Sequence, residues 1–343
     1  MTAIVVEGRP IGPGHPVYVI AEIGGNFTTV DQAVALIDAA AASGVDAVKL
    51  QTYRAETLSS TRAMFDMENT GVTSQHALFK AYEIDAEAHA SIFAYARSLG
   101  LTVFSTPSHA TDADMLLSLG VPATKVGSDD AVNLPFLAHL ARQGLPMLLS
   151  TGMCTMAEVA DSVSTILGEG LDQLVLLHAV TSYPTHPDHV NLRAMVAMGQ
   201  AFGLPVGYSD HTLGPVACLG AVALGACVIE KHFTLDKAAE GPDHMLSADP
   251  VEMAALVAQV RALERMLGDG VKRPAASERT TRLNNRKSLV VLRDLQAGAV
   301  LRADDLGIKR PGTGIAPKDL RQVLGRVLRR ELAADDVLTW DHL

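Results

Sequence analysis

Short apolar runs recur along the first three quarters of the chain, and each ends in a polar or ionisable residue. Runs that stay apolar at consecutive positions are typical of strands buried on both faces of a parallel sheet. Amphipathic segments separate these runs, so the pattern predicts alternating strands and helices. The predicted strands are Val17–Glu22, Ala47–Gln51, Thr102–Thr106, Thr124–Ser128, Met147–Ser150, Leu174–Val180, Val206–Asp210 and Val228–His232.

Helix signals fall between the predicted strands. Thr155 and Glu158 have the spacing of a capping box, and Asp249 begins a second box just before a proline. Asp85 opens another helix, which we expect to end before Gly100. Eight alternations of this kind favour a (β/α)8 barrel over an open doubly wound sheet. The chain lacks the glycine-rich phosphate-binding motifs of nucleotide folds, which also favours the barrel.

Two segments depart from the barrel pattern. The connection from Tyr53 to Lys80 is polar and too long for a plain barrel unit, and it follows the second strand, so we expect a lid over the active face. After Gly270 the chain becomes charged and loses its periodicity. We therefore expect a barrel domain over residues 1–269, a linker over 270–284 and a small domain over 285–343.

Composition narrows the classes of function. Hydrophobic residues make up 48% and charged residues 19% of the 343 residues, which is typical of a globular protein. The net charge of −10 comes without a basic stripe, so nucleic acid is not an expected partner. We find no signal-peptide pattern and no apolar run long enough to span a membrane, and we expect a cytoplasmic protein. The three cysteines lack the spacing of a disulfide framework or a zinc cage.

Polar residues stand at the carboxyl ends of all eight predicted strands, where barrel enzymes place their chemistry. His211 and His232 follow consecutive strands, so their imidazoles are expected to lie close enough to bind one divalent metal. The alternative is that each histidine only caps its own loop. The strand-end residues are Glu22, Lys49, Gln51, Thr106, Lys125, Ser128, Asp130, Ser150, Thr151, Tyr183, Ser209, Asp210, His211, Glu230 and His232.

Lys49 and Lys125 stand on separate strands together with several hydroxyl groups. This combination favours a small ligand with several negative charges, such as a phosphate and a carboxylate. The alternative is that both lysines only pair with Glu22 or Glu230. Two other classes of function stay open at this point: an aldolase that forms a Schiff base through a lysine, and a barrel that binds a sugar without turnover.

With these residues assembled, the chain resembles the sialic acid synthase family over nearly its whole length. The resemblance implies a TIM barrel followed by a small antifreeze-like (SAF) domain. It also implies an enzyme, a transferase that condenses phosphoenolpyruvate with an open-chain amino-sugar and releases phosphate by cleaving a C–O bond. The matching segments are Ala21-Glu-Ile-Gly24 with Asn26, Val48-Lys-Leu-Gln51, Phe104-Ser-Thr-Pro107, Lys125-Val-Gly-Ser128, Leu149-Ser-Thr-Gly-Met153, Tyr183-Pro184, Gly207-Tyr-Ser-Asp-His-Thr-Leu-Gly214, Ile229-Glu-Lys-His-Phe-Thr-Leu-Asp-Lys237, Glu240-Gly-Pro-Asp-His244 and Lys309-Arg-Pro-Gly312.

The resemblance also implies roles for individual residues. Glu22 would transfer a proton or activate water, and His211 and His232 would hold the metal, with Mn²⁺ expected first and Mg²⁺ or Co²⁺ as alternatives. A domain-swapped homodimer is implied, in which the small domain reaches the neighbouring subunit's site. Phosphoenolpyruvate would be bound by Lys49, Thr106, Lys125, Ser128, Ser150 and Ser209, and the sugar by Gln51, Asp130, Tyr183, Asp243 and, from the neighbouring subunit, Arg310.

The sequence departs from the commoner family pattern at Phe27, at Thr181 and at Asp129-Asp130. These positions bear on the sugar and not on the reaction. We expect N-acetylmannosamine as the acceptor, with a diacetamido-trideoxyhexose, the precursor of legionaminic or pseudaminic acid, as the alternative. The sequence shows no additional basic cluster that would bind a sugar 6-phosphate, so unphosphorylated sugars rank first.

Overall fold

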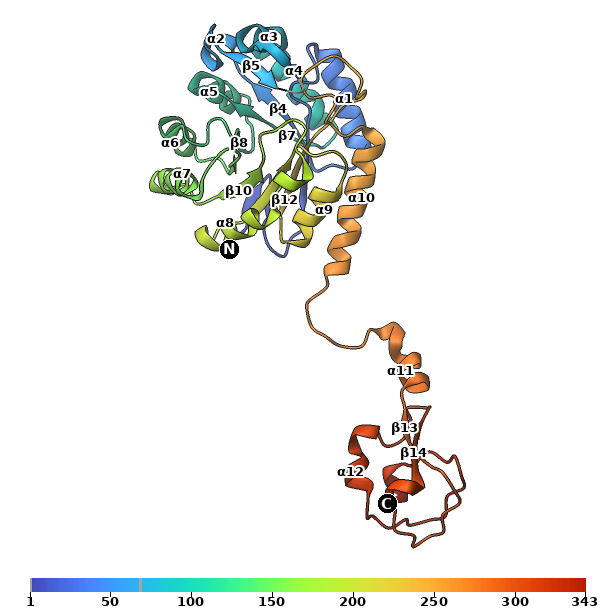
Figure 1. Ribbon diagram of the computed structural model, residues 1–343. Coiled ribbons are helices and arrows are strands. Elements are labelled where there is room, and N and C mark those ends of the chain that lie inside the picture. Colours follow the sequence, from blue (N-terminus) through green and yellow to red (C-terminus); the bar gives the residue numbers. More distant parts are fainter. Residues whose placement is uncertain (1, 68–69) are drawn as a thin grey trace. The chain divides into compact units, whose positions relative to one another are not determined.

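The structure, a computed structural model, describes residues 2–67 and 70–343. It divides into two compact units, Met1–Gly268 and Asp269–Leu343, which are described separately (Figure 1). The first unit contains the catalytic candidates named above except Arg310.

Eight parallel strands of the first unit form one sheet in the order β7-β4-β3-β12-β11-β10-β9-β8, in which the last strand along the chain pairs with the first. The first and last strands in the order, β7 and β8, also lie side by side, so the sheet closes into a barrel. All eight predicted strands and the (β/α)8 fold are thereby confirmed, with bounds that differ by no more than two residues. The strands are β3 (Tyr18–Glu22), β4 (Ala47–Thr52), β7 (Thr102–Pro107), β8 (Thr124–Val126), β9 (Met147–Ser150), β10 (Leu174–Ala179), β11 (Val206–Asp210) and β12 (Val228–His232).

A helix follows each barrel strand and covers the outside of the sheet (Figure 1). The predicted capping boxes at Thr155 and Asp249 are both formed, and Asp85 caps its helix by accepting a hydrogen bond from the Ala88 amide. These caps fix where the helices begin after the polar strand ends. The helices are α1 (Val30–Ala42), α4 (Ala86–Ser98), α5 (Ala110–Ser118), α6 (Leu134–Arg142), α7 (Met156–Gly168), α8 (Leu192–Phe202), α9 (Val216–Ala223) and α10 (Pro250–Leu267).

An antiparallel hairpin of β1 (Ile4–Val6) and β2 (Arg9–Ile11) precedes the barrel. Asp46, just before β4, accepts hydrogen bonds from the Arg9 guanidinium, the Arg261 guanidinium and the Val19 amide. One carboxylate therefore ties the hairpin, a barrel strand and α10 together at the end of the barrel opposite the strand-end residues.

The connection from Tyr53 to Lys80 is not an irregular loop. It contains α2 (Ala55–Leu58), a hairpin of β5 (Met64–Met67) and β6 (Gly71–Ser74), and most of α3 (Gln75–Tyr82). Glu68 and Asn69, which belong to the predicted lid, lie outside the described residues. That the segment moves as a lid stays a prediction.

The second unit is built around β13 (Ser288–Val291) and β14 (Leu306–Lys309), which pair antiparallel. The segment expected to be an irregular linker contains a 3₁₀ turn at Ala276–Glu278 and the short helix α11 (Arg279–Asn285), without a buried residue. One further short helix, α12 (Leu320–Val323), packs on the hairpin's core. That core consists of Leu289, Val291, Leu295, Leu301, Ile315, Val323, Leu328, Leu332, Leu338 and Leu343.

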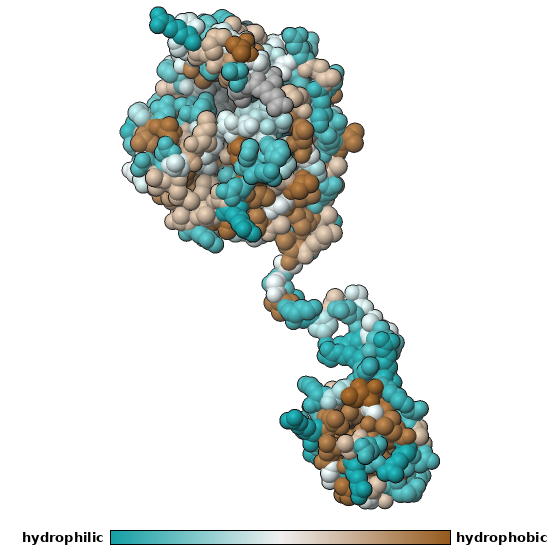
Figure 2. Space-filling view, viewed as in Figure 1, coloured by the Kyte–Doolittle hydropathy of each residue, from teal (hydrophilic) through white to brown (hydrophobic). Residues whose placement is uncertain are grey.

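Apolar side chains are also exposed on the second unit, among them Leu292, Ile308 and Trp340, and Figure 2 shows brown side chains at its surface. On the barrel unit, the same view shows hydrophilic and hydrophobic side chains intermixed. Within residues 2–67 and 70–343, we find no helix with the length and apolar character that crossing a membrane requires.

Gly207 on β11 tests how tightly the barrel is packed. An added Cβ would lie 2.6 Å from Leu177 Cδ2 and 2.7 Å from the Val228 carbonyl oxygen, which is backbone and cannot yield easily. We expect Gly207→Ala to lower the free energy of unfolding by about 1–3 kcal/mol in chemical denaturation. Gly168→Ala is the control, because no atom lies within 4 Å of its added Cβ. A Gly207→Ala variant as stable as Gly168→Ala would contradict this packing.

Candidate active site

A cavity of about 290 Å³ opens at the carboxyl ends of the barrel strands. It is lined by residues from every part of the barrel and by residues of the Tyr53–Lys80 connection. Asp130 and Arg310 are absent from the described lining. The other predicted site residues all line it: Glu22, Lys49, Gln51, Thr106, Lys125, Ser128, Ser150, Tyr183, Ser209, His211, His232 and Asp243.

Four charged side chains, which we call the floor cluster, meet at the bottom of the cavity: Glu22, Lys49, Lys125 and Glu230. The Lys49 ammonium contacts the Glu22 carboxylate and lies 3.9 Å from Glu230, and the Lys125 ammonium lies 3.5 Å from Glu230. Each of these side chains is at most 7% exposed. Two positive and two negative charges balance, which is what allows them to be buried together.

The floor cluster shifts the pKa of each member. Burial raises the pKa of Glu22 to about 7, assisted by the negative charge of Glu230 and opposed by Lys49. Burial also disfavours a charged Lys49, but the carboxylates of Glu22 and Glu230 outweigh it and raise the pKa of Lys49. Burial lowers the pKa of Lys125. Glu230 is buried too, yet the two ammonium groups lower its pKa to about 2.

Hydroxyl groups surround the floor cluster. Lys49 donates to Thr106 Oγ1 at 2.9 Å, Lys125 donates to Ser150 Oγ at 2.7 Å, and Ser209 Oγ donates to Glu230 at 2.8 Å. Ser128 Oγ accepts from the Gly152 amide at 3.0 Å. These small donors and acceptors line a surface that suits an anionic ligand with several oxygen atoms.

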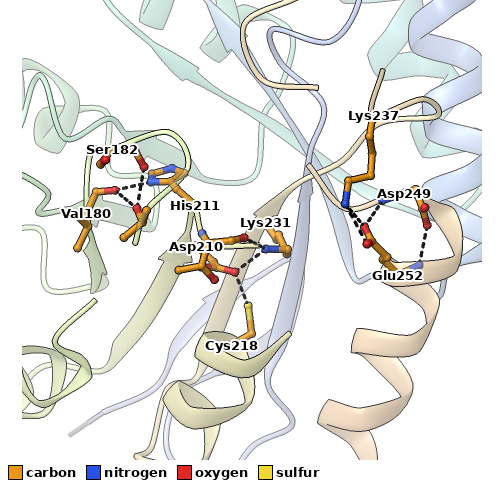
Figure 3. A network of polar contacts seen from close by, with 11 residues as sticks. Val180, Ser182, Asp210, His211, Cys218, Lys231, Lys237, Asp249 and Glu252 are labelled. Atoms are coloured by element: carbon orange, nitrogen blue, oxygen red, sulfur yellow. Dashed lines mark hydrogen bonds and ion pairs between the residues drawn. The ribbon is translucent and has the colours of Figure 1, made fainter. Parts of the chain in front are cut away.

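His211 and His232 lie on the same wall, with ring centroids 5.5 Å apart. Burial lowers the pKa of both imidazoles, so both are neutral near pH 7. Nδ1 of His211 donates to the Val180 carbonyl oxygen at 2.8 Å, which leaves Nε2 with its lone pair (Figure 3). His232 Nδ1 lies 3.6 Å from the Asp243 carboxyl. A backbone carbonyl or a carboxyl behind a ring is the usual arrangement around metal-binding histidines.

His211 and His232 could supply two ligands to one shared metal ion. Among residues 2–67 and 70–343, no group of three or more His, Cys, Asp or Glu side chains is arranged to hold a metal, so water or substrate oxygens would have to complete the coordination. Tyr183 packs against His211 with ring centroids 4.3 Å apart and limits how the imidazole can turn.

Asp243 lies over the pocket on the loop after β12. Burial raises the pKa of this carboxyl to about 7, with Lys49 acting in the opposite direction. Gly25, at φ +78°, lies directly beneath it, and a Cβ there would come within 2.7 Å of Asp243 Oδ2. The glycine therefore leaves room for the carboxyl to face the pocket.

Two predicted sugar contacts are not part of the cavity lining that the barrel unit provides. Asp130 accepts a hydrogen bond from Asn133 at 2.9 Å at the start of α6, and its neighbour Asp129 lines the pocket instead. Arg310 is exposed in the second unit, directly after β14. Their roles toward the sugar stay predictions.

The sequence did not single out the outer wall of the cavity. Leu58, Phe65, Leu78, Phe79 and Tyr82 line it, and all come from the connection between β4 and α4. The apolar residues within this otherwise polar segment were the sequence feature that could have indicated such a wall. Glu230 was noted only as a strand end that could pair with a lysine, and the structure makes it the carboxylate shared by both lysines.

A second buried ion pair lies between the barrel and its helices. Lys231 on β12 donates to Asp210 on β11 at 2.6 Å and to the Thr212 carbonyl oxygen at 2.8 Å. Asp210 also accepts from the Thr212 amide and from Cys218 on α9. Figure 3 shows His211 turned toward Val180 while its neighbour Asp210 points to Lys231 and Cys218. The pair thus fixes the backbone on both sides of His211.

Comparison with known proteins reveals similarity along the whole chain. The NeuB family matches residues 36–272 and the SAF domain matches residues 286–343. The N,N'-diacetyllegionaminic acid synthase of Legionella pneumophila is 42% identical over 98% of this chain and 97% of the relative. The synthase of the same name from Campylobacter jejuni is 37% identical over 93% of this chain and 98% of the relative. The crystal structure of N-acetylneuraminic acid synthetase from Leptospira borgpetersenii in complex with citrate superposes with a TM-score of 0.74 at 32% identity, covering 82% of this chain and 95% of that one.

Lys231→Met tests the second ion pair. Removing the ammonium leaves Asp210 buried without its counter-charge, so we expect the free energy of unfolding to fall by about 3–5 kcal/mol in chemical denaturation. The double variant Asp210→Asn with Lys231→Met should recover part of that loss. The control is Lys237→Met, which breaks the more exposed pair with Glu252 (Figure 3) and should cost about 1 kcal/mol or less. Equal losses for Lys231→Met and Lys237→Met would contradict a stabilising role for the buried pair.

Proposed function

The chain belongs to the NeuB family and carries a SAF domain, and from this premise we propose that it condenses phosphoenolpyruvate with an open-chain N-acetylated amino-hexose. The products would be a nine-carbon 2-keto acid and phosphate. The observation that carries the proposal is the floor cluster with its ring of hydroxyls beside a histidine pair, in one cavity at the strand ends.

We propose 2,4-diacetamido-2,4,6-trideoxymannose as the acceptor, so that the product is N,N'-diacetyllegionaminic acid. The sequence alone ranked N-acetylmannosamine first. Two relatives that match nearly the full chain, at 42% and 37% identity, are named as diacetyllegionaminic acid synthases, and they favour the alternative. N-acetylmannosamine becomes the second candidate.

Phosphoenolpyruvate would bind over the floor cluster. Its phosphate and carboxylate oxygens need cationic and hydroxyl donors, which Lys49, Lys125 and the surrounding Thr106, Ser128, Ser150 and Ser209 supply. Burial of both ammonium groups strengthens their interaction with an anion, because little water competes.

Glu22 would handle the proton of the attacking water. The enol carbon forms a bond to the sugar aldehyde carbon, water adds to the phosphate-bearing carbon, and the C–O bond to phosphate then breaks. A carboxyl with a pKa of about 7 can accept the proton from that water near neutral pH, and the same proton would then neutralise the alkoxide formed on the former aldehyde oxygen. The Gly24 amide donates to Glu22 at 2.5 Å and holds the carboxylate in place.

A divalent metal held by His211 and His232, Mn²⁺ in the first instance, would polarise the aldehyde carbonyl of the sugar. The hydrogen bond from His211 to Val180 and the ring of Tyr183 keep this histidine oriented. Gln51, Tyr183 and Asp243 would contact the sugar hydroxyl and amide groups, since all three line the cavity above the floor cluster.

Phosphate release tests the proposal. Purified protein with Mn²⁺ and phosphoenolpyruvate should release phosphate with the diacetamido-trideoxymannose, and more slowly with N-acetylmannosamine. Treatment with EDTA should abolish the activity, and readdition of metal should restore it. His211→Ala should lower kcat/KM by about 1,000-fold or more, because the aldehyde loses its electrophilic assistance.

Two results would overturn this assignment. Phosphate release that survives EDTA, together with trapping of the protein on the sugar by borohydride, would indicate a Schiff-base aldolase. Sugar binding without phosphate release from any acceptor would indicate a non-catalytic barrel. Folding of His211→Ala is checked by its circular dichroism and melting temperature.

We also propose a domain-swapped homodimer in which Arg310 completes the sugar site of the partner subunit. Support comes from the exposure of Arg310 and of several large apolar side chains, including Leu292 and Trp340, in the second unit. A unit with so small a core gains stability by burying such side chains against another surface.

Subunit complementation tests this arrangement. His211→Ala and Arg310→Ala chains are co-expressed with different tags, and the doubly tagged heterodimer is purified. Each homodimer should be nearly inactive, whereas the heterodimer should retain about half of the wild-type activity, because one of its two sites combines an intact barrel with an intact Arg310. An inactive heterodimer would indicate that Arg310 acts within its own subunit, and an active Arg310→Ala homodimer would indicate that Arg310 has no role in the site.

A further inference from the structure

The cavity has two chemically different ends. Its floor is polar and charged, whereas another part of its wall is apolar and comes from the β4–α4 connection, which leaves the carboxyl end of β4. This outer wall consists of Leu58, Phe65, Leu78, Phe79 and Tyr82.

Three aromatic rings connect the floor side to the hairpin. Tyr53 and Phe79 stack edge to face with centroids 5.1 Å apart, and Phe79 and Phe65 do the same at 5.6 Å. Tyr53 is buried, while Phe79 and Phe65 are half-buried. The rings therefore leave part of their apolar surface facing the cavity, where a ligand can cover it.

The alternation along β5 shows that Phe65 belongs to the inner face of the hairpin. Phe65 pairs with Thr73 and contacts Phe79, whereas the next residue, Asp66, pairs with Val72. Asp66 is exposed and Val72 is 75% exposed. Phe65 therefore packs inward by strand geometry, and the same hairpin offers a control position on its outer face.

Within the described barrel unit, the cationic groups that line the cavity belong to the floor. In the described part of the barrel unit, the cationic side chains that line the cavity are Lys49 and Lys125, and both are paired with carboxylates. Asp129 adds a carboxylate to the lining. This wall offers no counter-charge to a phosphate on the far end of a sugar, so such a phosphate would depend on the partner subunit's Arg310, which we propose for the sugar site.

The reaction orients the sugar in the cavity. Its aldehyde carbon must meet the enol carbon of phosphoenolpyruvate over the floor cluster, so C4, C5 and C6 extend toward the outer wall. Methyl groups at this end, from an acetamido group at C4 and a 6-deoxy carbon, would cover the half-buried rings. Hydroxyl groups at the same positions would lose water there without gaining a partner.

We infer that the outer wall, with Phe65 and Phe79 in it, determines specificity by selecting acceptors whose C4 and C6 substituents carry methyl groups and no charge. This inference rests on the proposed function and adds to it the residues that choose the sugar.

The test compares acceptor selectivity in Phe65→Ala, Phe65→Leu and the outer-face control Val72→Ala. The measured quantity is kcat/KM for 2,4-diacetamido-2,4,6-trideoxymannose divided by kcat/KM for N-acetylmannosamine. We expect Phe65→Ala to reduce this ratio about tenfold, because only the first sugar covers the ring. Phe65→Leu should retain most of the ratio, Val72→Ala should leave it unchanged, and KM for phosphoenolpyruvate should stay near the wild-type value in all three.

A measurement on the wild-type protein covers the case in which Phe65→Ala does not fold. N-acetylmannosamine 6-phosphate should have a kcat/KM at least about 100-fold below that of the diacetamido sugar. An unchanged ratio in a folded Phe65→Ala variant, or efficient use of the 6-phosphate, would overturn the inference while leaving the synthase reaction intact. Absence of phosphate release with every acceptor would instead refute the proposed function itself.

Discussion

The rest of the site depends on the mutual neutralisation of four buried charges. Glu22, Lys49, Lys125 and Glu230 come from four barrel strands, and none could be buried alone without a large desolvation penalty. Because the lysines are already neutralised, an anion bound as proposed would bring additional negative charge to the cluster. Glu22, with a pKa raised to about 7 by burial, is the member that can gain or lose a proton at little cost. The burial that forces these four charges to neutralise one another thus also brings the pKa of Glu22 close to neutral pH.

The buried ion pair of Asp210 and Lys231 forms a second group of charges, on the opposite face of the sheet from the floor cluster. Side chains alternate along a strand, so Ser209 and Glu230 face the cavity while their neighbours Asp210 and Lys231 face the helices. Both groups of charges join β11 to β12, one on each face of the sheet. This explains why two strands that are buried throughout carry so many ionisable residues. It also means that the loop bearing His211 is held by contacts that never touch a substrate.

The barrel could be predicted from the sequence because its information is local. A strand buried on both faces reads as an apolar run, and a capped helix start such as that at Thr155 is marked within four residues. What the sequence did not reveal depended on weak strand signals or on the orientation of single residues. The β5–β6 hairpin was read as a loop, since its strands are short and only partly buried. Asp129 and Asp130 differ by one position, and only the folded turn decides that Asp129 lines the cavity.

The floor and the outer wall are built from different parts of the fold, which separates reaction from specificity. Floor residues lie at strand ends, where the register with neighbouring strands and the balance of charges restrict substitution. The outer wall lies on an excursion between β4 and α4, where a change at Phe65 or Leu58 disturbs no barrel hydrogen bond. A barrel of this design can keep one carbon–carbon bond-forming step and change the sugar it accepts by altering the excursion alone. The floor is accordingly the basis of the proposed reaction class, and the excursion is the basis of the proposed choice of acceptor.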